Sequence, residues 1–396
     1  MHKRSLGLSL FGSVAIIVAA CGTAATPTPS VASQPPAAST APSAAASTEP
    51  STAPSTAAHS DLKIGVVTDI GTLNDKNFNE YAFKGAVDGA AAIGAAEPQS
   101  IVPTSASEYA ASIKSFADQN YNVIVTVGFN LAAATGEAAV AFPNIKFIGV
   151  DQSPICITAA GKQDFTFPCP LDSTTVAPNY TSVAFQEDQA GYLAGIVAAG
   201  ASTKGAIGAI GGTSICAPCV RYIQGYELGA KSVKPDITVI SAYVTNDFSA
   251  KAFHDQAGGK TFADNFLKQN KNVDVLFQVA GETGNGVLDA ACAAGILGIG
   301  VDVDQFNSYP ASGPCLLTSA EKHLRLAVSD AIKAAAGGTL KGGTTLYDAK
   351  TNGIGVSIGH SMSGKWAADT QIKLNAAIAG MKDGSLKTCP EKCGSL

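Results

Sequence analysis

The chain contains 396 residues, of which 14% are charged, with 26 lysines and arginines against 31 aspartates and glutamates. Its formal net charge is −5 and it has no basic run, so nucleic acid is not expected as a partner. Beyond the first 20 residues no run of about 18 apolar residues occurs, so no further membrane-spanning segment is expected.

The first 60 residues have the composition of an export signal followed by a tether. Residues 1–20 combine a basic start, a largely apolar core and a small-residue end, which predicts a secretory signal peptide. The residues before Cys21 resemble a bacterial lipobox, so Cys21 is the expected lipidation site. Residues 21–60 are this cysteine and a segment of almost only alanine, threonine, proline and serine. Because that segment has few large apolar side chains to bury, we expect a disordered tether on the extracytoplasmic face of the cell membrane.

The rest of the chain is large for one core and suits two α/β lobes. Its first part alternates β-branched runs with helical runs, which predicts βαβ units and a mainly parallel sheet. The expected strands here are 62–68, 100–102, 123–127 and 146–151, and the expected helices are 77–95, 107–119 and 132–141. Residues 152–180 contain four prolines and interrupt the alternation, which indicates an irregular insertion.

The alternation restarts at residue 182, which indicates a second α/β half. The expected strands are 182–185, 206–210, 238–243, 273–279, 298–301, 316–318 and 354–358. The expected helices are 186–199, 220–233, 253–267, 286–294, 324–336 and one that starts at 363. Two such halves predict a ligand cleft beyond the carboxyl ends of the strands.

Several candidate binding residues follow expected strands. The loop after the first strand contains Asp75, Phe78 and Asn79. Asp151 and Asp302 each end a later strand, and carboxylates there can accept hydrogen bonds from hydroxyls. The structural alternatives are a helix cap with Phe78 in the core for the loop, and loop-capping acids for the two aspartates.

The nine cysteines indicate disulfides, since eight remain after Cys21 in a chain expected outside the cytoplasm. A mixture of free thiols and fewer bridges is the alternative. No metal site is expected, because no pair of CxxC motifs and no neighbouring histidines complete a ligand set. Proximity in the sequence suggests the pairs Cys156–Cys169, Cys216–Cys219, Cys292–Cys315 and Cys389–Cys393.

The sequence contains no Ser-His-Asp constellation, HExxH motif or P-loop. His254, His323 and His360 are scattered without an evident partner. We therefore expect a binding protein without a cofactor and not an enzyme. Cys216 and Cys219 follow a strand and open a helix, as thioredoxin-like redox pairs do, so a thiol oxidoreductase is a less favoured alternative.

Eight stretches, kept in order across residues 61 to about 385, resemble the basic membrane protein family of bacterial substrate-binding lipoproteins. That family includes purine nucleoside receptors of ABC importers. The stretches are 69–79 (DIGTLNDKNFN), 127–129 (VGF), 147–151 (FIGVD), 189–195 (QAGYLAG), 225–229 (GYELG), 279–286 (VAGETGNG), 300–305 (GVDVDQ) and 317–322 (LTSAEK).

The resemblance implies a two-lobed type I periplasmic-binding-protein fold, in which each lobe is a mainly parallel sheet flanked by helices. The expected lobe 1 comprises residues 61–183 and 306–348, and lobe 2 comprises 184–305 and 349–396. The chain is expected to cross between the lobes near residues 181–186, 303–315 and 345–353.

The resemblance also implies a purine nucleoside site. Phe78 and Tyr222 would stack on the purine, Asp151 would face the base edge, and Asp302 with Lys322 would bind the ribose. The other implied ligand-binding residues are Asp75, Asn79, Phe129 and Gly281. The implied partners are a small-molecule ligand, an ABC permease and, through the lipid, the membrane, and we expect a monomer.

Three departures from the family affect the expected cleft. Tyr222 stands where the family usually has phenylalanine, so its hydroxyl needs a partner. The Cys216–Cys219 pair lies beside that position, and the 152–180 insertion follows Asp151. Because the family also contains regulators, a membrane-tethered ligand sensor is the main alternative to an import function.

Overall fold

The computed structural model describes residues 60–152, 173–358, 360, 365–366 and 368–389. The expected signal peptide, Cys21, nearly all of the tether and most of the 152–180 insertion lie outside the described residues. Among the described helices, none combines the length and apolar character needed to cross a membrane.

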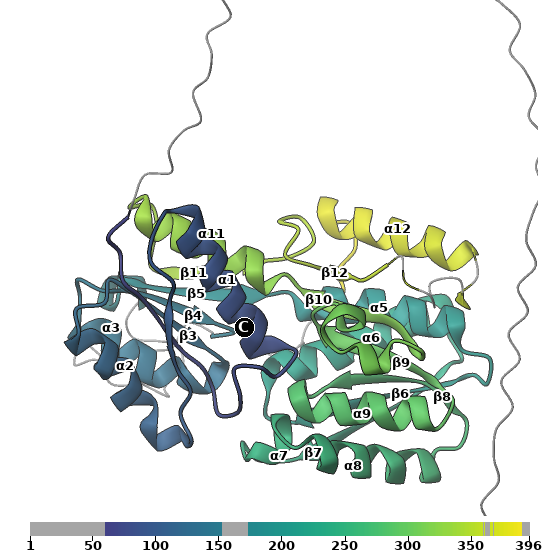
Figure 1. Cartoon of the computed structure of the whole chain (residues 1–396). Helices are drawn as coiled ribbons and strands as arrows, with labels where there is room; N and C mark the ends of the chain where they lie inside the picture. Colours follow the sequence, from purple (N-terminus) through teal and green to yellow (C-terminus); the bar gives the residue numbers. More distant parts are fainter. Residues whose placement is uncertain (1–59, 153–172, 359, 361–364, 367, 390–396) are drawn as a thin grey trace, which may run out of the picture. The chain divides into compact units, whose positions relative to one another are not determined.

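The described chain contains two six-stranded sheets with corresponding strand orders (Figure 1). The first has the order β11-β5-β4-β3-β1-β2, and all of its pairs are parallel. Its strands are β1 (Ile64–Val67), β2 (Gln99–Ile101), β3 (Val123–Val127), β4 (Lys146–Val150), β5 (Tyr180–Phe185) and β11 (Gly343–Tyr347).

The second sheet has the order β12-β10-β9-β8-β6-β7, and only its β12–β10 pair is antiparallel. Its strands are β6 (Ala206–Thr213), β7 (Thr238–Thr245), β8 (Val273–Val279), β9 (Leu297–Asp302), β10 (Leu316–Lys322) and β12 (Ile354–Val356). The expected α/β fold with two mainly parallel sheets is therefore confirmed. Since β4 and β9 hold the same place in the two orders, their ends are corresponding positions.

Helices cover both faces of the first sheet, which explains why its central strands are continuous apolar runs. Ile64 and Val66 of β1 pack toward one cluster and Val67 toward another. The helices of this lobe are α1 (Phe78–Ala92) packed on α11 (Leu324–Ala336), and α2 (Tyr109–Asp118) beside α3 (Ala132–Ala141).

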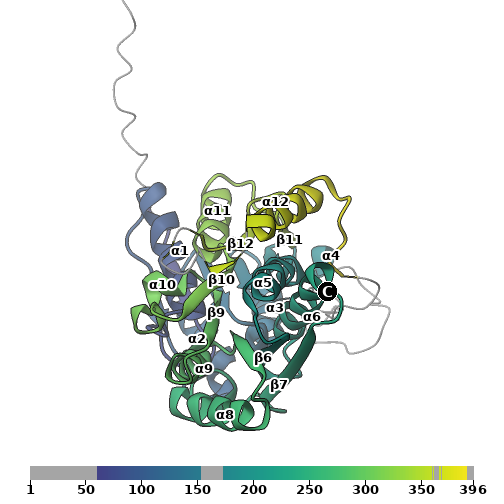
Figure 2. The same ribbon diagram turned by 90° about the vertical axis from the view of Figure 1, so that its right-hand side faces the viewer.

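The second lobe has the same plan. Its helices are α5 (Glu187–Ala201) packed on α6 (Ala217–Val233), α8 (Gln256–Gln269) packed on α9 (Gly281–Ala293), and α12 (Ala368–Asp383) beside α5. The short helices are α4 (Ser173–Val176), α7 (Ala250–Phe253) and α10 (Gln305–Ser308). The views in Figure 1 and Figure 2 both show α5 and α6 side by side.

Glycines bring the backbones of α5 and α6 into contact. A Cβ atom at Gly191 would lie 2.1 Å from the carbonyl oxygen of Tyr222, and one at Gly225 would lie 2.1 Å from that of Asp188. Only a residue without a side chain fits such an approach. The start of α6 is therefore fixed against α5.

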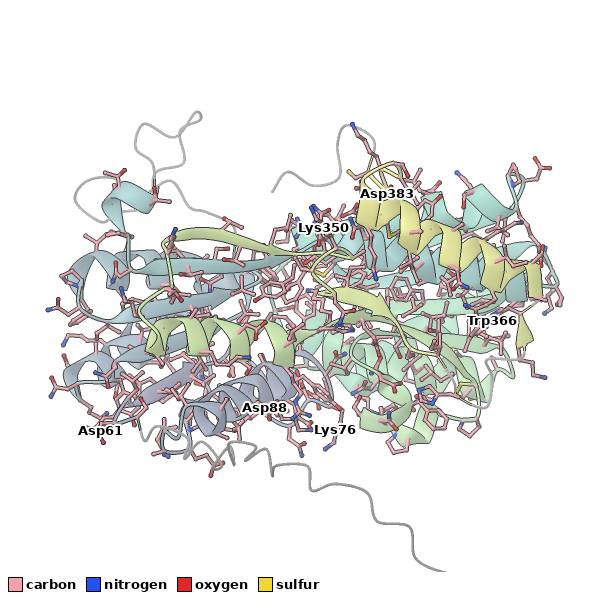
Figure 3. All side chains as sticks on the ribbon, turned by 90° about the horizontal axis from the view of Figure 1, so that it is seen from above. Asp61, Lys76, Asp88, Lys350, Trp366 and Asp383 are labelled. Atoms are coloured by element: carbon pink, nitrogen blue, oxygen red, sulfur yellow. A yellow bond between two sulfur atoms is a disulfide. The ribbon has the colours of Figure 1, made fainter. Side chains whose placement is uncertain are left out.

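The chain crosses between the lobes three times. The first crossing lies between β5 and α5, and the last lies between β11 and β12, where Figure 3 labels Lys350. The expectation that residues 306–322 belong to lobe 1 is wrong, because β10 pairs with β9 in the second sheet. The second crossing therefore lies at His323, between β10 and α11, instead of within 303–315.

Three of the expected element assignments also need correction. The strand expected at 182–185 to begin the second half is β5, which pairs with β4 and β11 in the first sheet. The helix expected at 253–267 spans the end of α7 at Phe253 and most of α8, which begins at Gln256. The two are separate because Asp255 is the N-cap of α8, and its carboxylate accepts a hydrogen bond from the amide of Gly258 (2.8 Å). Strand β11 was not expected at all. Its sequence, GTTLY, has no alternating apolar pattern, and it is a partly exposed edge strand.

The disulfides Cys216–Cys219 and Cys292–Cys315 are present, as expected. Cys389 is also disulfide-bonded. The other three cysteines of the expected pairs, Cys156, Cys169 and Cys393, lie outside the described residues.

Candidate ligand-binding site

A cavity lies where strand ends of the two sheets meet, and it encloses about 630 Å³ of free space including its mouth. We call it the inter-lobe cavity. Its lining includes every residue expected to bind ligand, namely Asp75, Phe78, Asn79, Phe129, Asp151, Tyr222, Gly281, Asp302 and Lys322. Residues that are far apart in the sequence are thus brought together, and their roles toward a ligand stay predictions.

Asp75 organises the loop between β1 and α1. Its carboxylate accepts hydrogen bonds from the amides of Asn77 (2.8 Å), Asn79 (2.9 Å) and Glu80 (3.2 Å), so it caps the first turn of α1. Burial raises the pKa of Asp75 to about 7, although these hydrogen bonds lower it. The cap chemistry that the sequence left open for this loop therefore applies to Asp75, while Phe78 is only half-buried.

The first-lobe wall also carries Asn79 and Phe129. The side-chain nitrogen Nδ2 of Asn79 donates to the backbone carbonyl of Thr72 (3.4 Å). The side-chain oxygen Oδ1 of Asn79 is buried and lacks a hydrogen-bond partner among the described residues. The ring of Phe129 lies 5.2 Å from that of Phe248 and 6.4 Å from that of Phe253, centroid to centroid. Since both partners belong to the second lobe, these aromatic contacts join the lobes beside the cavity.

Lys322, at the end of β10, lies among three buried carboxylates. It forms an ion pair with Asp151 across the cleft, and its Nζ is 3.4 Å from Glu187 and 3.6 Å from Asp302. Burial alone would lower the pKa of Lys322, but the carboxylates raise it above its ordinary value. Burial raises the pKa of Asp151 to about 6, although Lys322 lowers it. Lys322 is therefore charged and approaches Asp151 more closely than Asp302, its implied partner.

Helix α6 contributes two further members of this cluster. Arg221 forms a buried ion pair with Glu187 (2.6 Å). The hydroxyl of Tyr222 donates to Asp302 (3.2 Å) and also approaches the carbonyl of Ala320 (3.4 Å). The hydroxyl that departs from the family pattern therefore has partners within the protein.

Phe78 and Tyr222 belong to different lobes and both lie near the ammonium of Lys322. Its Nζ lies 5.2 Å from the ring centroid of Phe78 and 5.5 Å from that of Tyr222, within the range of cation–π attraction. An aromatic face from each lobe, a fixed cation and carboxylates thus converge on one cavity.

Asp151 and Asp302 share an unusual backbone conformation. Their φ angles are +58° and +64°, in the left-handed region that residues other than glycine rarely adopt. They follow or end β4 and β9, the corresponding strands of the two sheets. Strain of this kind persists where surrounding structure enforces it and is typical of binding sites.

Sequence reasoning left out several lining residues. The additional ones are Asp69, Gly128, Cys216, Pro218, Cys219, Phe253, His254, Val279 and Val301. Phe253 and His254 could not be predicted as lining residues because one continuous helix was expected there. Asp69 begins the family-like stretch 69–79, so it could have been predicted as a binding residue. Burial lowers the pKa of His254 to about 4, so this side chain is neutral at pH 7.

Comparisons with known proteins agree with this arrangement. Residues 62–378 match the family model Bmp, described as PnrA-like ABC transporter substrate-binding proteins. The chain is 30% identical over 322 residues to the ABC transporter nucleoside-binding protein BmpA of Lactococcus lactis, covering 77% of this chain and 84% of that protein. It is 26% identical over 320 residues to Basic membrane protein D of Borreliella burgdorferi, covering 80% and 85%.

Solved structures show the same fold. An ABC transporter solute-binding protein of Aeropyrum pernix has a TM-score of 0.69 at 23% identity, covering 84% of this chain and 94% of that one. A solute-binding protein of Conexibacter woesei has a TM-score of 0.62 at 21% identity, covering 83% and 98%. With the resemblance to the basic membrane protein family confirmed, the chain belongs to the family of PnrA-like ABC transporter substrate-binding proteins.

Proposed function

We propose that the chain is an extracytoplasmic lipoprotein that binds a purine nucleoside in the inter-lobe cavity and delivers it to an ABC permease. The observation that carries this proposal is the convergence, in one cavity, of an aromatic face from each lobe with the Asp151–Lys322–Asp302 cluster. The nucleoside-binding name of the Lactococcus lactis relative supports the ligand class.

The chemistry of a nucleoside matches the groups that line this cavity. A purine has flat faces for stacking against Phe78 and N–H groups that donate to carboxylates. Asp151 Oδ1 is buried and has no hydrogen-bond partner in the described part of the chain, so it can accept from the base. The ribose diol can donate to Asp302 and accept from Lys322.

The membrane anchor is proposed from the sequence alone, with Cys21 as the lipidated residue. A lipoprotein of Pyrococcus abyssi is 28% identical to this chain over 309 residues, which supports the same class of protein. We also propose that the protein is a monomer and that it passes its ligand to a permease.

A thermal-shift screen tests the ligand class. The compact unit Thr56–Leu396 would be mixed with adenosine, guanosine, inosine, free purines, ribose and amino acids. A ligand that binds only the folded protein stabilises it by about 2.7 kcal/mol at one hundred times Kd. We expect a shift with at least one nucleoside and none with ribose or amino acids.

A matched pair of variants locates the site. Asp302→Asn should abolish the nucleoside shift, whereas Asp264→Asn, on the exposed face of α8, should keep it. No shift with any nucleoside, in folded protein freed of carried-over ligand, would refute the purine assignment.

Uptake by cells distinguishes import from sensing. Deletion of the gene should abolish uptake of the nucleoside that shifts the protein, whereas a sensor would leave uptake by an intact permease unchanged. Thiol oxidoreductase activity is disfavoured because Cys216 and Cys219 are only 2% and 5% exposed, which leaves little access for a protein substrate.

A further inference from the structure

The Cys216–Cys219 disulfide forms part of the wall of the inter-lobe cavity. It lies where β6 ends and α6 begins, and both cysteines line the cavity together with Pro218. The other disulfide with both cysteines in the described residues, Cys292–Cys315, is not among the lining residues. A ligand in the cavity would therefore contact the Cys216–Cys219 disulfide but not the Cys292–Cys315 disulfide.

The disulfide also sets the first turn of α6. Cys216 is the N-cap residue, its Sγ accepts from the amide of Cys219 (3.2 Å), and its carbonyl accepts from the amide of Val220 (3.0 Å). The next residues along the helix are Arg221 and Tyr222, which reach the buried cluster through Glu187 and Asp302. A shift of the first turn would therefore also move the side chains of Arg221 and Tyr222.

The helix has no room to move closer to α5. Behind it, Gly191 and Gly225 hold the backbones of α5 and α6 in contact, with no space for a Cβ atom. When an S–S bond is broken, its sulfurs must separate to van der Waals contact. Because both cysteines line the cavity, this separation changes the shape of its wall.

We propose that the Cys216–Cys219 disulfide is a redox-sensitive element of the binding wall, whose reduction weakens ligand binding and which bound ligand protects from reduction. This inference rests on the proposed function, because it places the nucleoside against this wall. The coupling is reciprocal: if the oxidised form binds ligand more tightly, the ligand must favour the oxidised form by the same factor.

The redox step needs an external dithiol. One of its thiolates attacks a sulfur of the disulfide, the S–S bond breaks and a mixed disulfide forms. The second thiol of the reductant then displaces the protein sulfur. Two electrons and two protons pass to Cys216 and Cys219, which become thiols, and the dithiol becomes a cyclic disulfide. Both cysteines are buried and both line the cavity, so a ligand bound there would shield them from the reductant.

Ligand protection can be measured with dithiothreitol as the dithiol. The compact unit Thr56–Leu396 would be reduced with and without an equimolar mixture of adenosine, guanosine and inosine, alkylated at intervals and analysed by peptide mass spectrometry. At one hundred times Kd, we expect about 100-fold slower reduction of Cys216–Cys219, since only the unliganded fraction reacts. Reduction of Cys292–Cys315 in the same sample is the internal control and should not change.

The Cys216→Ser/Cys219→Ser variant tests affinity, because serine at 216 keeps a good N-cap and removes only the bond. We expect the variant to bind about tenfold more weakly than the oxidised protein, a loss of about 1.4 kcal/mol. If the oxidised protein binds a nucleoside but reduction is not slowed, or the folded variant binds equally well, the inference is wrong and the proposed function stands. If the oxidised protein binds none of the three nucleosides, both fail.

Discussion

The two walls of the inter-lobe cavity are built differently. On the first-lobe wall, Asn79 Oδ1 and Asp151 Oδ1 are buried without a hydrogen-bond partner in the described part of the chain. On the second-lobe wall, Tyr222 and Asp302 hydrogen-bond to each other, and a disulfide fixes the helix that carries Tyr222. The oxygens of Asn79 and Asp151 on the first wall are therefore available to accept hydrogen bonds from a ligand. On the second wall, Tyr222 and Asp302 use hydrogen bonds to hold each other in place.

Because the two walls differ in this way, we expect their substitutions to affect ligand affinity and protein stability differently. Changes on the first wall should mainly alter affinity, and changes on the second should also alter the free energy of unfolding. The first three of the following predictions test that separation, and the fourth concerns the pH dependence of stability.

Replacing Lys322 by methionine should affect both properties most strongly. The change leaves Asp151, Glu187 and Asp302 buried with Arg221 as the remaining cation of the cluster. Leaving buried charges uncompensated costs about 3–5 kcal/mol of unfolding free energy. Urea denaturation measures this loss.

The matched control is Lys231→Met, whose ion pair with Glu227 is exposed and should contribute less than about 1 kcal/mol. Equal losses in the two variants would contradict a structural role for the cluster.

Gly191→Ala should disturb the second wall from behind. The added methyl would meet the carbonyl oxygen of Tyr222 at 2.1 Å, so α6 must shift. Overpacking of this kind costs about 1–3 kcal/mol, and we expect weaker ligand binding as well. In contrast, Gly337→Ala at the end of α11 adds a methyl with no atom closer than 3.4 Å and should leave binding unchanged. Denaturation and calorimetric titration of both variants decide whether the α5–α6 contact supports the wall.

Phe78→Ala and Tyr222→Phe compare the walls directly. Loss of the half-buried Phe78 ring should weaken nucleoside binding by about 1–3 kcal/mol, the usual contribution of base stacking, with little change in unfolding. Removal of the Tyr222 hydroxyl should lower the unfolding free energy by about 1 kcal/mol, because Asp302 loses a donor. Isothermal titration measures the affinities and denaturation measures the unfolding free energies. If both variants lost affinity and stability to the same extent, the two walls would not differ in role.

The last prediction concerns the pH dependence of stability. Because the pKa of Asp75 is raised to about 7 in the folded protein, unfolding releases a proton between about pH 4 and pH 7. Its contribution to stability is complete below about pH 4 and is lost as pH rises through 7, with a slope of up to about 1.4 kcal/mol per pH unit. Asp75→Asn should remove this slope, whereas Asp264→Asn should keep it, and thermal unfolding at several pH values distinguishes them.

The sequence predicted much of this site because strand ends of parallel sheets converge. Asp151 and Asp302 could be located from the apolar runs that precede them, and family resemblance added Tyr222 and Lys322. Glu187 and Arg221 could not be found in this way, because their pairing depends on the contact between α5 and α6. The sheet to which β10 belongs could not be predicted from the sequence either, since the sequence of a strand does not specify which strand it pairs with.

A crystal structure of the compact unit with its best-shifting nucleoside tests the central claim most directly. We expect the purine ring against Phe78 inside the inter-lobe cavity, with a ribose hydroxyl within hydrogen-bond distance of Asp302. A nucleoside bound elsewhere, or a cavity occupied by a ligand that makes no contact with Phe78 or Asp302, would contradict it.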